Sequence, residues 1–217
     1  MRGIFSLDGP VGRALERFAA LLGVSILWLV CSFPLATIGA STAALYTMTL
    51  RMVRNEEGKI VSGFFRAFRE NFKKSTLIHL ILCAFGALVG FYWIIVGGMP
   101  ETMRVFFHGA SLMFTFIWLM EALFVYPVQA RFENTVWNTM KNAWLMAAGN
   151  LHIFLLALII TAAPFMTLLL NTGLFLSTLP VWILLGPGLT AWLNSYLFQH
   201  CFRKYVSSGK EEEETEI

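Results

Sequence analysis

The chain has 217 residues, of which 57% are hydrophobic and only 13% are charged, and its mean hydropathy is +0.67. A soluble domain carries roughly a quarter of charged residues, so this composition excludes an ordinary soluble domain and indicates that lipid covers much of the surface. The formal charge of +3 does not indicate a nucleic-acid partner, because the basic residues flank apolar stretches and are typical topology determinants there.

Two apolar stretches begin the chain and predict a helical hairpin. The first predicts a helix over 14–34, and the second a helix over 40–54 after a tight connection. A cleavable secretory signal is the alternative for this region. The apolar stretch is longer than a signal core and continues directly into the next, so we expect both helices to be retained.

Two later segments, 60–74 and 132–148, carry aromatic residues at helical spacing between polar and basic residues. Both are predicted to be amphipathic helices lying in the cytoplasmic headgroup layer. Their aromatic residues include Phe64, Phe68, Phe72, Trp137 and Trp144. Two interpretations remain open, since such a surface either anchors the protein in the headgroups or docks a cytoplasmic partner.

Charged residues are absent from 142–202, a run of 61 residues, and scarce in the other long apolar stretches. A bilayer-spanning helix needs roughly 20 apolar residues. The remaining spans are predicted at 75–97, 104–127, 151–171 and 178–203. The fold class is therefore an all-α membrane protein with about six transmembrane helices, and three similar helical hairpins are suggested by the resemblance of 39–44 to 186–191.

The distribution of basic residues predicts the orientation. With the N-terminus inside, fifteen of the sixteen Lys and Arg residues lie on the cytoplasmic side, and only Arg104 lies outside. We therefore expect a plasma-membrane protein with both termini in the cytoplasm. Residues 1–206 are predicted to form one transmembrane domain, and 207–217 a disordered acidic tail.

Three features of the predicted spans are candidates for function. Glu121 is the clear case of a charged residue inside a span, where it is either a proton or cation relay or a structural polar contact. Asn194 is suited to hydrogen bonding between helices. Gly186, Pro187 and Gly188 predict a break in the last helix, because proline removes a backbone donor and frees a carbonyl. Broken helices line binding sites in many transporters but also occur as simple kinks.

No cofactor or metal site is predicted. His79 and His152 begin two helices without a second ligand at metal-binding spacing, and the three cysteines read as small apolar side chains. The hydrolase, ATPase and dinucleotide-binding motifs are missing, so we expect no enzymatic activity. An enzyme acting on lipid or lipid-linked sugar is the least supported of the functional hypotheses, because the cytoplasmic carboxylates form no recognised catalytic arrangement.

The segments 26–46, 64–73, 126–135 and 186–205 resemble the YesL family of bacterial membrane proteins, catalogued as a domain of unknown function. The chain departs from that family at Gly39-Ala40-Ser41, where relatives often have Gly-Pro-Ser. The family is found largely in Gram-positive bacteria, and its members tend to be encoded beside carbohydrate-uptake transporters and polysaccharide-degradation genes. The resemblance implies an accessory component of carbohydrate uptake, whose partners are the lipid bilayer and sugar transporter subunits. A small stand-alone secondary transporter is the alternative, and the oligomeric state is left open.

Overall fold

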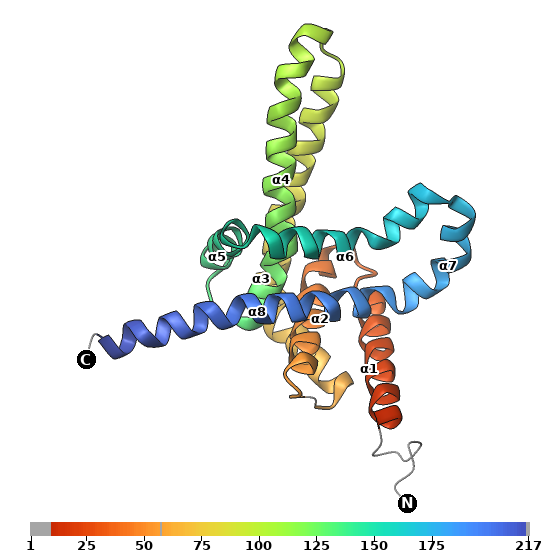
Figure 1. The fold of residues 1–217 in the computed structure, drawn as a ribbon, viewed down its shortest axis with the longest axis vertical. Coiled ribbons are helices and arrows are strands. Elements are labelled where there is room, and N and C mark those ends of the chain that lie inside the picture. The colour runs from red at the N-terminus through yellow and green to blue at the C-terminus, as the bar shows by residue number, and fades with distance from the viewer. Residues whose placement is uncertain (1–9, 57, 216–217) are drawn as a thin grey trace, which may run out of the picture.

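The computed structural model describes residues 10–56 and 58–215, with only the backbone described for residue 10 and for 207–215, and within these ranges it contains helices and no strand (Figure 1). The predicted all-α class is therefore confirmed. The helices are α1 Pro10–Cys31, α2 Ile38–Val53, α3 Ile60–Gly97, α4 Glu101–Arg131, α5 Val136–Gly149, α6 Leu151–Leu170, α7 Thr172–Leu184 and α8 Gly186–Thr215, with a short 3-10 turn Leu35–Thr37 before α2.

Four of the described helices, α1, α3, α4 and α6, are long and apolar enough to cross a membrane. A fifth span results if the bent pair α7 and α8 counts as one. Their exposed apolar side chains are therefore compatible with insertion into lipid. The helix expected at 40–54 differs, because α2 has 16 residues and measures about 24 Å, less than the bilayer core of about 30 Å.

The short helix α2 is the centre of the protein. It packs against α1, α3, α4 and α8, and eleven of its residues are buried. Small residues at its start allow this close packing, and Gly39 lies directly against the Ser75 carbonyl and His79 of α3. Because other helices surround α2, none of its residues is exposed, and its serine and threonine hydroxyls bond to its own backbone carbonyls.

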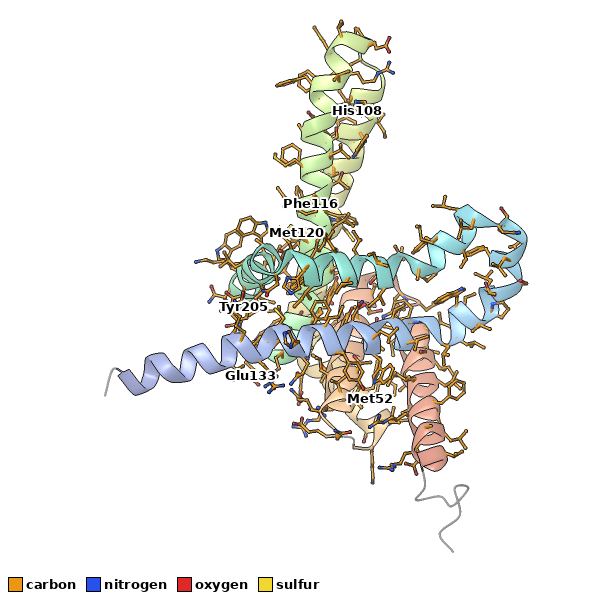
Figure 2. The ribbon with its side chains drawn as sticks, viewed as in Figure 1. Met52, His108, Phe116, Met120, Glu133 and Tyr205 are labelled. Atoms are coloured by element: carbon orange, nitrogen blue, oxygen red, sulfur yellow. The ribbon has the colours of Figure 1, made fainter. Side chains whose placement is uncertain are left out.

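Helices α3 and α4 form an antiparallel hairpin that projects beyond the other helices (Figure 1). Indole N–H groups link its two arms, because Trp118 Nε1 donates to the Leu82 carbonyl at 2.9 Å and Trp93 Nε1 donates to Thr115 Oγ1 at 2.9 Å. Phe116 and Met120 lie where α6 crosses α4, and the Phe116 ring packs edge-on to Phe154 of α6 (Figure 2).

The prediction of a separate interfacial helix over 60–74 is wrong. It forms the first part of the continuous 38-residue helix α3, because no proline or glycine interrupts the chain between it and the following apolar span. Its phenylalanines do not form one exposed face: Phe64 is fully buried against the core, Phe68 is half-buried, and Phe72 is 38% exposed. The second predicted interfacial helix does form separately as α5, with Thr135 as its N-cap.

Helices α6 and α8 pack side by side and cross the α3–α4 hairpin rather than running parallel to it, and α7 connects them at their far end (Figure 1). The predicted last span at 178–203 is divided, because α7 and α8 are bent by 72° at Leu185. The third predicted hairpin is therefore a three-helix unit. The backbone of α8 continues to Thr215, residues 216–217 lie outside the described part of the chain, and the division at residue 206 stays a prediction.

Basic residues gather where α1 begins and α2 ends. Arg17 Nη2 donates to Asn55 Oδ1 at 2.9 Å, and Arg54 forms an ion pair with Glu56 at 2.9 Å. Arg104 lies instead at the tip of the α3–α4 hairpin, where it donates to the Met99 carbonyl at 3.0 Å. Arg104 and these basic residues thus lie at different ends of the protein. The orientation itself stays a prediction, and Arg2 lies outside the described residues.

Candidate functional site: a cavity at a broken helix

The break between α7 and α8 is held by helix α1. The Gly188 N–H donates to Ser25 Oγ at 2.9 Å, and Ser25 Oγ in turn donates to the Leu21 carbonyl at 2.8 Å. Both Ser25 and Gly188 are buried. A hydroxyl of α1 therefore satisfies a backbone donor that the break would otherwise leave unpaired inside an apolar core, where an unpaired group is costly.

Glycine is required at position 188 by this contact. A Cβ atom at Gly188 would overlap Ser25 Oγ and would lie only 2.6 Å from the Leu21 carbonyl oxygen. Pro187 contributes the bend itself, because it has no N–H to donate to the carbonyl of Ile183 one turn earlier. The predicted break at Gly186, Pro187 and Gly188 is thus present as a fixed joint between three helices.

The bend leaves a cavity of about 470 Å³ between α7 and the helices α1, α2, α6 and α8. Its wall is mainly apolar, and Gly186 and Pro187 form part of it. Five aromatic residues line it, namely Trp28, Tyr46, Phe165, Phe175 and Trp182. Three threonines, Thr42, Thr161 and Thr190, add hydroxyl groups. Among the described residues that line this cavity, none carries a charge.

Asn194 lies one helical turn beyond Thr190 and Ala191 on α8, on the face that lines the cavity. Its Nδ2 donates to Thr161 Oγ1 at 3.0 Å and also hydrogen-bonds to the Tyr46 side chain. Asn194 is 1% exposed, and its Oδ1 has no hydrogen-bond partner among the described residues. The structure therefore brings Asn194 and the helix break to one site.

Glu121 lies elsewhere. It is on α4, between Trp118, which bonds to α3, and Tyr126, whose hydroxyl lies 2.9 Å from His79 Nδ1. The Glu121 side chain is 7% exposed, and its Oε1 has no hydrogen-bond partner in the described part of the protein. Since it does not line the cavity, Glu121 and Asn194 do not form one polar site.

Sequence reasoning missed Ser25, Tyr46 and Thr161, which hold the break and Asn194 in place. It also missed the 2.9 Å hydrogen bond from Ser195 Oγ to Thr49 Oγ1, which joins α8 to α2 where both residues are fully buried. Serine and threonine are common in membrane helices and often bond to their own backbone. The sequence therefore carries no signal that separates these residues from the others.

No group of three His, Cys, Asp or Glu side chains with metal-binding geometry occurs among the residues that the structure describes. His79 and Cys83 form a pair, with Nε2 and Sγ 3.5 Å apart.

The fold and the site define an all-α protein with membrane-compatible helices and an uncharged cavity at a broken helix. Residues 21–93, about a third of the chain, match the model of a family described as "Protein of unknown function, DUF624". The match covers the second half of α1, all of α2 and most of α3, so it includes the buried central helix. No curated protein and no solved structure gives a significant match.

Proposed function

We propose that this protein is a non-catalytic, multi-pass membrane protein of the YesL type, located in a bacterial plasma membrane with both termini in the cytoplasm. Its role is that of an accessory component of carbohydrate uptake that contacts subunits of a sugar transporter. The observation that carries this proposal is the exposed face of helix α5. The position of Arg104 at the hairpin tip, away from the basic residues that start α1 and end α2, supports the proposed orientation.

Helix α5 presents a stripe of exposed residues on one face, while its opposite face packs against the protein. Trp137 is 75% exposed, Trp144 is 43% exposed, and Lys141 lies between them on the same face. The opposite face, including Thr139, Ala143 and Ala147, is buried, and α4 is the main helix that α5 packs against. Tryptophan carries a large share of binding energy in protein interfaces, so this stripe suits a partner protein.

Photo-crosslinking tests the proposed contact. A photoreactive amino acid replaces Trp137 or Trp144 in the tagged full-length protein, which is cross-linked in its native membrane and identified by mass spectrometry. We expect adducts with the membrane subunits of a carbohydrate transporter. Leu155 on α6 is the matched control, because it is 50% exposed on a different helix and should give no such adduct.

Two results would contradict the accessory role. The first is cross-linking at Trp137 and Trp144 to lipid alone, which would assign the stripe to anchoring in the headgroup layer. The second is equal recovery of the same subunits from Leu155, which would show only that the proteins are crowded in the membrane.

A small secondary transporter is the second candidate, and the cavity at the helix break favours it. Discontinuous helices whose freed backbone groups face a cavity are a common feature of transporter sites. Against a proton-coupled version of this function, Glu121 does not line the cavity.

Replacing Glu121 by glutamine separates the two candidates. For an accessory protein we expect full uptake and a free energy of unfolding changed by less than about 1 kcal/mol, because glutamine has nearly the same size and shape as glutamate. Thermal unfolding in detergent and an uptake assay driven by a pH jump measure the two effects. Loss of uptake with unchanged protein abundance would instead support a proton-coupled transporter.

A further inference from the structure

We propose that the cavity between α1, α2, α6, α7 and α8 binds one neutral amphiphile, a lipid of the monoacylglycerol kind, with its acyl chain along the aromatic wall and its hydroxyl-bearing head near Tyr46. This inference concerns the cavity and does not depend on the contact proposed for α5.

The size and wall of the cavity select an acyl chain. Its volume of about 470 Å³ lies within the range of about 300–1,000 Å³ that is usual for small-molecule sites. Aromatic side chains such as Trp28, Phe165 and Trp182 form much of the wall. The site is held open because the fixed joint at Gly188 directs α7 away from α8 by 72°.

The absence of charge selects a neutral head. None of the described residues that line the cavity is Asp, Glu, Lys, Arg or His. A phosphate or carboxylate head would lose its hydration there without gaining an opposite charge, which is a large cost in an apolar environment. A head group that carries only hydroxyl or ester oxygens avoids this cost.

The polar groups at the cavity suit a hydroxyl. Tyr46 lines the cavity, and its hydroxyl accepts a hydrogen bond from the Asn194 side chain, so its own hydrogen is available to a ligand oxygen. Thr42, Thr161 and Thr190 add hydroxyl oxygens to the wall, so the site offers both donors and acceptors to a ligand hydroxyl.

The test uses the full-length protein in lipid nanodiscs and a 1-monoacylglycerol with a diazirine in its acyl chain. After irradiation, we expect labelled peptides from α6 and α7 around Thr161 and Phe175. Leu179→Trp places a larger side chain in the cavity wall and should lower the labelling at least about fivefold. Leu176→Trp is the matched control on the same helix, because Leu176 is 60% exposed and does not line the cavity, and it should leave the labelling unchanged.

Head-group recognition is tested by competition and by a second variant. Lysophosphatidate with the same acyl chain should compete at least about tenfold less well than unlabelled monoacylglycerol. Tyr46→Phe removes only the hydroxyl and should weaken binding of the neutral lipid about two- to tenfold, the effect of one hydrogen bond. This variant also keeps the proposal testable if Leu179→Trp does not fold.

Three results would overturn the proposal. Labelling that is spread over all lipid-facing helices and is equal in Leu179→Trp would show general contact with the bilayer. Equal competition by lysophosphatidate would show that the cavity does not select against a charged head group. Unchanged binding in Tyr46→Phe would show that the Tyr46 hydroxyl does not bind the head group.

Discussion

Replacing Gly39 by alanine should lower the free energy of unfolding by about 2 kcal/mol or more, which corresponds to a fall in Tm of at least about 4 °C for a chain of this length. A Cβ atom at this position would overlap the backbone carbonyl of Ser75 and the His79 side chain of α3. A backbone carbonyl within a helix cannot move aside as a flexible side chain can. Helix α2 would therefore have to separate from α3, at the most extensive contact of the buried central helix.

Gly90→Ala is the matched control for Gly39→Ala. Gly90 lies in α3, and a Cβ atom there would have no neighbour within 4 Å. Because alanine favours a helix over glycine by about 1 kcal/mol, this variant should be at least as stable as the parent protein. Thermal unfolding of the purified proteins in mild detergent measures both effects. Equal Tm values for the two variants would show that α2 does not pack against α3 in this way.

Replacing Gly188 by alanine should also destabilise the protein, by about 1–3 kcal/mol, and should release the joint at the helix break. The added Cβ would overlap Ser25 Oγ and approach the Leu21 carbonyl, so α8 would be pushed away from α1. Ser25→Ala should cost about 1–3 kcal/mol for a different reason, because it leaves the buried Gly188 N–H without its acceptor.

The two changes share one contact, so their effects should not be additive. Removing the Ser25 hydroxyl frees part of the space that a Cβ at Gly188 would occupy, and we expect the double variant to be more stable than the sum of the single losses predicts. Gly109→Ala on α4 is the control, since no atom lies within 4 Å of its Cβ position. Additive losses, or a loss in Gly109→Ala of the same size, would argue against a specific joint between α1 and α8.

Much of the fold is visible in the sequence because the membrane imposes simple rules. In lipid, long charge-free runs must form helices, because a helix satisfies all of its backbone hydrogen bonds within itself. This rule predicts the all-α class and the location of most helices. Pro187 between two glycines marks a break, and the structure places a 72° bend there. Asn194 stands out as a polar residue inside a span, and the structure gives it bonds to Thr161 and Tyr46.

The sequence by itself therefore determined the class of protein, the main helices, the helix break and the buried polar residue Asn194. Only the tertiary structure decided that α2 is enclosed, that Phe64 faces the core, and that Glu121 lies away from the cavity. The physical reason is that in a membrane both lipid and neighbouring helices are apolar. Apolar periodicity consequently cannot distinguish a face that meets lipid from one that meets protein, and only packing between helices far apart in the sequence makes that choice.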